Sequence, residues 1–352
     1  MGSASGMFEA SPPKIPSEAA QAAGLCYVSN GTSGLTRLGT PGRFRYRDAR
    51  GKTVRDSRTL LRIRTLAIPP AWTEVWIAPG ANAHLQATGR DAKGRKQYRY
   101  HADFIAIRDG VKYAHLMDFA KALPALRKRL KADLKLKGLP REKVMAAIVT
   151  LLEETLIRVG NEDYVRANAS FGLTTLRNRH VRVRGHALRF QFKGKSGKMW
   201  NLSIQDRRIA SIVASCQELP GQHLFEYRDE DGVVRAISSS DINAYLREIS
   251  GRDITAKDFR TWAGTVKAAM GFSAANAAPS KKLVRAVIAG VAAELGNTVA
   301  ICRRCYIHPA VITAFEAGAL VLRIPRTGRD GLSRYERAVM NFLRRPGDSL
   351  AS

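Results

Sequence analysis

The sequence predicts an α+β protein of more than one domain, in which a small β-rich domain precedes a larger, mostly α-helical domain with a small β-sheet. The chain has 352 residues, 45% of them hydrophobic, which is enough for two domains with cores of their own. Apolar residues alternate with period two in the first third of the chain. From about residue 109 they recur at the three-to-four-residue spacing of helices.

The first domain is predicted over residues 24–106, where short apolar runs are broken by glycine and proline. Alternating residues in "RFRYRD" and "QYRYH", with the turn sequences "DARG" and "DAKG" beside them, predict strands joined into hairpins. Trp72 and Trp76, from the stretch "IPPAWTEVW", are expected in the core of this β-rich module.

The second domain is predicted over residues 109–325, after a short linker near 105–110. The stretches 112–134 and 141–161 carry apolar residues at helical spacing. The segments "HVRVRG" and "ALRFQFKGKSGKMWNLSI" then alternate with period two around the turn "KGKSGK", which predicts a hairpin. Further helices are expected at 205–217, 238–250, 255–272, 279–295 and 309–317, and Thr255 with Asp258 resembles a capping box.

Both ends of the chain differ in composition from the two predicted domains. Residues 1–23 are small, polar and proline-rich, which predicts a flexible arm, and they have no apolar stretch of the kind found in signal peptides. Residues 326–352 form a basic tail, for which both a last helix and a loose arm remain open.

The charge balance indicates the kind of partner that the protein binds. There are 58 Lys and Arg against 30 Asp and Glu, a formal net charge of +28. A fold does not need this excess, and a polyanion such as nucleic acid is the expected partner because it releases counterions when basic side chains bind it. A membrane is not expected, because no run of 18 apolar residues is present.

The four cysteines do not form a predicted metal site. Cys302 and Cys305 have the spacing of a zinc or redox pair, but neither Cys26 nor Cys216 supplies a second ligand pair. We therefore expect reduced cysteines that pack in a cytoplasmic protein. The sequence contains no glycine-rich phosphate loop and no paired-carboxylate metal motif, so no cofactor and no metal are expected.

The stretch "LGNTVAICRRCYIHP" (295–309) places Tyr306 close to two arginines and two cysteines. Such a tyrosine is either a core residue on a helix or a nucleophile toward a phosphate. Transfer at a phosphodiester needs a nucleophile, cations for the non-bridging oxygens and an acid for the leaving oxygen, all in line. Arginine suits the phosphate and lysine suits the acid, but the chain has too many of both for composition to choose.

Several segments, in order, resemble the type IB DNA topoisomerases, in the compact form of poxviruses and bacteria. They span about residues 25–320, and together they imply a bacterial DNA-binding isomerase whose two lobes clamp around DNA with basic inner faces. The segments are "GRDAKGRKQYRYH" (89–101), "LIRVGN" (156–161), "GLTTLRNRHVRV" (172–183), "FKGKSGK" (192–198), "KDFRTW" (257–262) and "LGNTVAICRRCYIHP".

The resemblance also implies a reaction. Tyr306 would attack a backbone phosphate to form a 3′-phosphotyrosyl intermediate, the free strand would swivel, and religation would leave supercoiled DNA relaxed without ATP or metal. Arg158 and Arg260 would hold the phosphate together with Asn297, which stands where poxvirus and eukaryotic relatives carry histidine. An amide can donate to a phosphate oxygen but cannot shuttle a proton. The adjacent Arg303 and Arg304 are expected to help ionise the phenol.

The general acid implied by the resemblance is Lys195, because the family's lysine directly follows a glycine, as in "KGK" here. Lys193 and Lys198 are the alternatives in the same turn. Lys257, three residues before the second arginine, is expected either to contact DNA or to lie on an exposed helix face. His180 is expected to be a hydrogen-bonded strand histidine. DNA contacts in the first domain are expected from cations interleaved with aromatic rings, at Lys93, Arg95, Lys96, Tyr98 and Tyr100.

Two other functions remain compatible with the residues. A tyrosine recombinase would have a similar catalytic set, but it would normally show a His-x-x-Arg pair where this chain has Lys257-x-x-Arg260, and its N-terminal DNA-binding domain would be helical. A basic architectural protein would bind DNA without forming a covalent adduct. The expected partner in each case is double-stranded DNA. For the topoisomerase, we expect a monomer that needs no nucleotide cofactor and associates with the cytoplasmic nucleoid.

Overall fold

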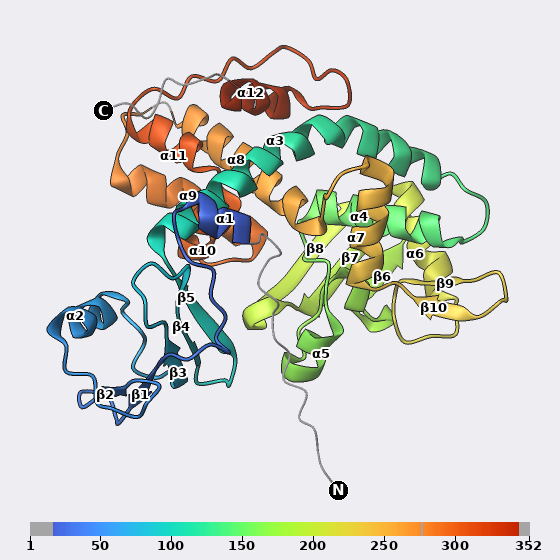
Figure 1. The fold of residues 1–352 in the computed structure, drawn as a ribbon. Helices are drawn as coiled ribbons and strands as arrows, with labels where there is room; N and C mark the ends of the chain where they lie inside the picture. The colour runs from blue at the N-terminus through green and yellow to red at the C-terminus, as the bar shows by residue number, and fades with distance from the viewer. Residues whose placement is uncertain (1–16, 276, 345–352) are drawn as a thin grey trace, which may run out of the picture. The chain divides into compact units, whose positions relative to one another are not determined.

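The computed structural model describes residues 17–275 and 277–344, and it divides into two compact units, Met1–Ala114 and His115–Ser352 (Figure 1). The division falls inside the long helix α3 (Ala102–Asp133). A linker was expected near residues 105–110, and this expectation is wrong because the helix runs through these positions without a break. Phe104 and Ile107 extend the helix, since they pack with Ala20 in a small apolar cluster.

The first unit is built on one antiparallel sheet of five strands, in the order β2-β1-β3-β4-β5. One face of the sheet packs on helix α2, whose Ile63 joins Leu35, Val75, Ile77 and Ala87 in the core. The strands are β1 (Leu35–Leu38), β2 (Arg45–Arg47), β3 (Thr73–Ile77), β4 (Leu85–Arg90) and β5 (Lys96–Tyr100), and the helix is α2 (Ser57–Thr65).

Two expectations for this unit need correction. The arm expected over residues 1–23 contains helix α1 (Ser17–Ala22), which is anchored because Ala20 is fully buried against Phe104; residues 1–16 of the arm lie outside the described residues. Trp72 and Trp76 are only half-buried. Trp72 packs at the edge of the core, and Trp76 donates its indole N–H to the carbonyl oxygen of Thr32 at 3.0 Å.

The described residues of the second unit combine helices with two small antiparallel sheets. In the sheet β6-β7-β8, the strands β7 and β8 form the predicted hairpin, and β6 corresponds to the alternating segment "HVRVRG". The strands are β6 (Val181–Arg184), β7 (Ala187–Lys193), β8 (Met199–Gln205), β9 (Glu226–Arg228) and β10 (Val234–Ala236). The short 3₁₀ helices are η1 (Leu173–Thr175), η2 (Asn178–His180) and η3 (Lys195–Gly197).

The helices of the second unit pack around α8, which contacts α4, α9, α10, α11 and α12 (Figure 1). Helix α4 is almost entirely apolar and buried from Val144 to Leu152. The helices are α4 (Arg141–Thr155), α5 (Glu162–Asn168), α6 (Arg207–Gln217), α7 (Ser239–Ser250), α8 (Ala256–Ala274), α9 (Lys281–Leu295), α10 (Val299–Tyr306), α11 (Pro309–Glu316) and α12 (Arg334–Leu343).

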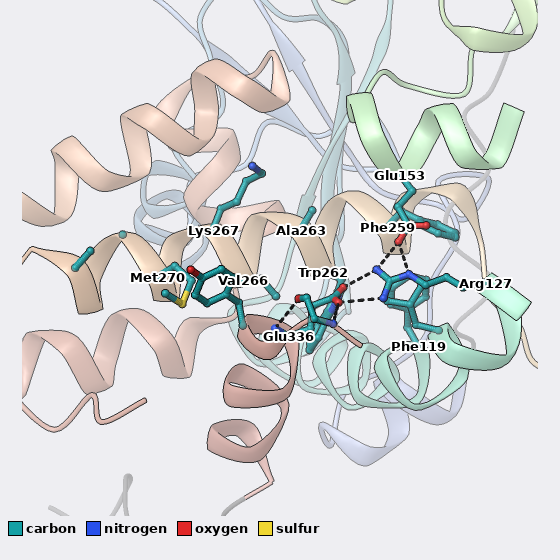
Figure 2. A pocket seen from close by; sticks show the side chains of 15 residues that line it. Phe119, Arg127, Glu153, Phe259, Trp262, Ala263, Val266, Lys267, Met270 and Glu336 are labelled. Carbon is teal, nitrogen blue, oxygen red and sulfur yellow. Dashed lines mark hydrogen bonds and ion pairs between the residues drawn. The ribbon is translucent and has the colours of Figure 1, made fainter. Parts of the chain in front are cut away.

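The basic tail expected over residues 326–352 contains the ordered helix α12, and residues 345–352 lie outside the described residues. Glu336 in its first turn accepts hydrogen bonds from Arg127 of α3 and from the indole of Trp262 of α8. Figure 2 shows Arg127 reaching both Glu336 and Glu153 of α4. The buried carboxylate of Glu336 therefore joins α12 directly to α3 and α8, and Arg127 extends this network to α4.

Within the described part of the chain, no single helix has the length and apolar character to cross a bilayer. Helices α9 and α10 meet that test only when taken together, and a bend of 87° separates them.

Candidate active site

A cavity of about 260 Å³ in the second unit collects residues that are far apart in the sequence. Its lining includes four predicted catalytic residues, Arg158, Lys195, Arg260 and Tyr306, and also the predicted DNA contact Lys257. A larger cavity of about 630 Å³ runs along α8 toward α3 and α12 (Figure 2), and none of those five residues lines it. The cationic side chains that line the smaller cavity make it the better candidate for chemistry on a phosphate.

Arg158 lies in the segment that follows α4, which ends at Leu156 in the left-handed conformation with φ 56°. The backbone here approaches residues 172–175 closely, and Leu173 N donates to Arg158 O at 2.9 Å. A Cβ on Gly172 would lie 2.6 Å from both Arg158 O and the Cα of Gly160. Only glycine fits between them, so this contact fixes the backbone that carries the arginine.

Arg260 is a buried charge on α8, with 3% of its surface exposed. Its guanidinium donates to the carbonyl of Leu156, at the end of α4, and to that of Leu295, at the end of α9, the latter at 2.6 Å. Burial, followed by the nearby charge of Arg158, lowers the pKa of Arg260 to about 10, although Tyr306 opposes this shift. The guanidinium remains a cation at neutral pH, in a place where an anion would relieve its desolvation.

Asn297 follows Gly296, which ends α9 in the left-handed conformation with φ 63°. Its side-chain oxygen accepts a hydrogen bond from Arg158, so the amide nitrogen is left to point elsewhere. Among the residues that the structure describes, Asn297 Nδ2 and Arg260 Nε are buried donors without a hydrogen-bond partner. Buried donors normally find acceptors, and two such donors next to Arg158 match the acceptor oxygens of a phosphate.

Tyr306 is the last residue of α10 and is partly buried. The Cζ of Arg260 lies 5.1 Å from the centroid of its ring. Gly264 of α8 permits this approach, because a Cβ there would lie 2.5 Å from the carbonyl oxygen of Tyr306. Helix α10 was not predicted; it begins after Thr298, whose side chain accepts from Ile301 N at 3.4 Å.

The cations expected around Tyr306 need correction. Arg303 and Arg304 are exposed on α10 and do not line the cavity. Arg303 instead pairs with Glu316 at 3.2 Å. The guanidinium next to the phenol belongs to Arg260, because residues adjacent on a helix point to different sides while α8 packs directly against α10.

Lys195 lies at the tip of the hairpin between β7 and β8, in the turn where Ser196 has φ 63°. Its ammonium donates to the hydroxyl of Tyr164 at 3.3 Å and lies 4.6 Å from the centroid of that ring. Lys198, by contrast, donates to the carbonyl of Ala293 at 2.6 Å, and Lys193 does not line the cavity. Of the three lysines in this turn, Lys195 is the one that lines the cavity.

The other predicted positions lie as follows. Lys257 is exposed in the first turn of α8, and Asp258 beside it forms the predicted capping box with Thr255. His180 is buried at the end of η2, before β6, and its Nδ1 accepts from Arg177 N at 3.0 Å. Burial, followed by the charges of Arg179 and Arg177, lowers the pKa of His180, so the ring is neutral at pH 7.

The predicted DNA contacts of the first unit lie on and beside β5. Lys93 and Arg95 are exposed in the turn before it, where Asp91 pairs with Arg95 at 2.6 Å. Lys96, Tyr98 and Tyr100 alternate along the strand and therefore share one face. The two tyrosine rings stack at 6.0 Å.

The cysteines do not all pack in the interior. Cys216 and Cys302 are buried, and burial raises the pKa of Cys302 to about 11. Cys26 is exposed, so the packing interpretation is wrong for this residue. The described residues contain no group of three or more His, Cys, Asp or Glu side chains placed to hold a metal ion.

Comparison with known proteins decides the family. Residues 101–317 match the family model of the eukaryotic DNA topoisomerase I catalytic core, which covers more than half of the chain. Residues 43–91 match the N-terminal domain of bacterial DNA topoisomerase IB. The chain belongs to the type IB DNA topoisomerase family. The match to the catalytic core spans every segment that lines the cavity of Tyr306.

Viral type IB topoisomerases are among the similar proteins. DNA topoisomerase 1B of Acanthamoeba polyphaga mimivirus is 33% identical over 262 residues, which is 71% of this chain and 78% of the relative. DNA topoisomerase 1 of rabbit fibroma virus is 23% identical, over 65% of this chain and 72% of the relative. DNA topoisomerase 1B of vaccinia virus (strain Copenhagen) is 22% identical, over 66% and 73%. This topoisomerase accordingly acts on DNA.

Tyr164 is a cavity residue that sequence reasoning missed. It belongs to α5, a helix of 7 residues that was not predicted as a separate element. The signal available in the sequence is the "NED" that begins the helix, because the side chain of Asn161 caps it and two acidic residues follow in the first turn.

Proposed function

We propose that this topoisomerase relaxes supercoiled DNA through a covalent bond between Tyr306 and the 3′-phosphate of one cleaved strand. The phenol oxygen attacks the phosphorus and loses its proton to solvent. The bond from phosphorus to the 5′-oxygen breaks, and Lys195 gives a proton to that oxygen. The freed strand swivels, and the 5′-hydroxyl then attacks the phosphotyrosine to rejoin the strand and release Tyr306.

One observation carries the proposal: Arg260 Nε and Asn297 Nδ2 are buried donors without hydrogen-bond partners. Arg260 lies over the ring of Tyr306, and Asn297 is hydrogen-bonded to Arg158. Charge accumulates on the non-bridging oxygens of a phosphate as the nucleophile attacks. Donors that are fixed in advance and shielded from water stabilise such charge, and removing one of them from an enzyme typically costs about 10²- to 10³-fold in rate. The side chains need little reorganisation, because backbone carbonyls already hold both arginines.

Lys195 fits the acid because its ammonium reaches the cavity from a turn that is otherwise exposed. Unlike Arg158 and Arg260, a lysine can release a proton at an accessible pKa, because deprotonation does not require a neutral guanidinium. Asn297 would bind a phosphate oxygen through its amide nitrogen. Because an amide cannot carry a proton, the proposed mechanism assigns it no acid–base step.

The proposed reaction needs neither ATP nor a divalent metal, because the phosphotyrosine bond conserves the energy of the broken phosphodiester. The two units are proposed to clamp one duplex as a monomer in the nucleoid. The net charge of +28 and the aromatic and basic face of β5 support this mode of binding. The proposed DNA contacts on and beside that face are Lys93, Arg95, Lys96, Tyr98 and Tyr100, with Lys257 at the cavity.

Plasmid relaxation in EDTA without ATP tests the proposed function. The wild-type protein is expected to relax the plasmid fully, Tyr306→Phe to be inactive, and the matched control Tyr227→Phe, on β9 outside the cavity, to be active. An absolute need for metal or ATP would contradict the mechanism. So would site-specific exchange of strands between duplexes in place of relaxation, which is the behaviour of a recombinase.

A further inference from the structure

The ammonium of Lys195 makes both of its observed contacts with one residue, Tyr164 of α5. It donates to the phenol oxygen at 3.3 Å and lies 4.6 Å from the ring centroid, so it meets both the polar edge and the π face of the same side chain. Tyr164 lines the same cavity as Arg158, Arg260 and Tyr306. Its surface is 43% exposed, so Tyr164 is not a residue of the protein core.

The backbone around Lys195 is already restrained. Phe171 N donates to Lys193 O at 2.8 Å on one side of the turn, and Lys198 donates to Ala293 O at 2.6 Å on the other. Gly194 cannot take a side chain, because a Cβ there would lie 2.6 Å from Trp200 Nε1. The remaining freedom belongs to the flexible side chain of Lys195, whose four-carbon stem allows the ammonium to point into solvent.

Helix α5 is held firmly enough to act as a fixed support. The side chain of Asn161 caps its first turn by accepting from Asp163 N at 2.7 Å. Glu162 meets His223 Nε2 at 3.1 Å, which ties the helix to the loop before β9. A tyrosine on such a helix has two rotatable side-chain bonds, so it loses little entropy when it restrains a neighbour.

We propose that Tyr164 is a positioning residue for the general acid, and that its ring and hydroxyl keep the Lys195 ammonium inside the cavity, where the leaving 5′-oxygen is formed. This inference rests on the proposed role of Lys195. Tyr164 itself exchanges no proton. It increases the fraction of time for which the Lys195 ammonium lies within reach of the leaving 5′-oxygen. Protonation of that oxygen, and with it cleavage of the phosphodiester, is therefore faster.

The test uses two short duplexes that differ in one atom. In one, the bridging 5′ atom at the cleavage site is oxygen; in the other it is sulfur, which leaves as a thiolate and needs no proton. With oxygen, Lys195→Ala is expected to lose about 10²-fold or more in single-turnover cleavage. Tyr164→Leu is expected to lose about 10-fold, and Tyr164→Phe, which keeps the ring, about 3-fold. With sulfur, all three variants should cleave within about 2-fold of wild type, because no acid is required.

Lys193→Ala is the matched control, since it removes a lysine from the same turn that does not line the cavity. It should change cleavage of both duplexes by the same factor. A Tyr164→Leu loss that is equal for oxygen and sulfur would overturn the proposal, because Tyr164 would then act through DNA affinity or folding. If Lys195→Ala slows cleavage of both duplexes equally, Lys195 is not the general acid. The proposed role of Tyr164 is then wrong as well, because it depends on that of Lys195.

Discussion

Replacing Glu336 with glutamine tests how the last helix is fastened to the catalytic unit. Glu336 is 8% exposed, and its carboxylate accepts four hydrogen bonds. Oε1 accepts from Arg127 Nη2 at 2.8 Å and from Trp262 Nε1 at 3.1 Å, and Oε2 accepts from Arg127 Nη1 at 3.0 Å and from Ser333 N at 2.8 Å (Figure 2). A glutamine replaces one of the two carboxylate oxygens by an amide nitrogen, which donates and cannot accept. In either orientation of the amide, the two donors that bonded to that oxygen lose their acceptor.

The expected loss of stability is about 3 kcal/mol, because each buried donor left without an acceptor costs about 1–3 kcal/mol. The charge of Arg127 stays partly paired, since Glu153 lies 2.5 Å from its Nη2. The expected loss is therefore smaller than the full cost of two unpaired buried donors. The matched control is Glu316→Gln, which breaks a half-exposed pair with Arg303 at 3.2 Å and should cost less than about 1 kcal/mol.

The loss should also depend on pH. Burial by itself would raise the pKa of Glu336, but the hydrogen bonds and charge of Arg127, helped by Ser333, outweigh it and hold the pKa below its ordinary value. A carboxyl with a depressed pKa stabilises the folded state above its unfolded pKa, about 4.3, and loses that contribution as the pH falls further. Urea unfolding of the wild type and of Glu336→Gln, at pH 7 and below pH 4, measures the difference in unfolding free energy at each pH. A difference under about 1 kcal/mol at pH 7, or one that grows in acid, would refute the reasoning.

Three further substitutions test residues in and around the candidate active site. Gly172→Ala should displace the backbone of Arg158 and cost about 1–3 kcal/mol of stability together with cleavage activity, measured by urea unfolding and single-turnover cleavage; wild-type behaviour would show that the close approach is dispensable. Arg260→Lys should cut the cleavage rate by about 10²-fold or more, since an ammonium cannot reproduce the planar fork that holds two carbonyls, and unchanged cleavage would contradict this role. Asn297→Ala should slow cleavage by about 10- to 100-fold while leaving DNA affinity within about 3-fold, whereas loss of affinity alone would argue for a binding role.

Periodicity predicted the long helices of the second unit well. The stretch expected at 279–295 contains α9, and the stretch expected at 238–250 contains α7. The short helices α1, α2 and α10 were missed, because segments of 6 to 9 residues are too short to show a clear helical period. Ala20 of α1 is buried by Phe104. The sequence pattern of a six-residue segment cannot predict packing against a residue more than eighty positions away.

Sequence proximity was also a poor guide to the surroundings of the phenol. Arg303 and Arg304 adjoin Tyr306 in the chain, yet Arg260 from another helix lies over its ring. Similarly, nothing in "FKGKSGK" separates three lysines by their chemistry. They are distinguished in the fold by Tyr164 on one side and Ala293 on the other. Family resemblance named the candidate residues, but which groups face each other depends on how the helices pack.

The most direct measurement concerns the atom that bonds to phosphorus. A duplex that loses its short 3′ fragment on cleavage traps the covalent intermediate, and digestion with peptide mass analysis locates the attached nucleotide. We expect the adduct on Tyr306, with none formed by Tyr306→Phe and an undiminished yield from Tyr227→Phe. An adduct on any other residue, or one that persists in Tyr306→Phe, would contradict the central assignment.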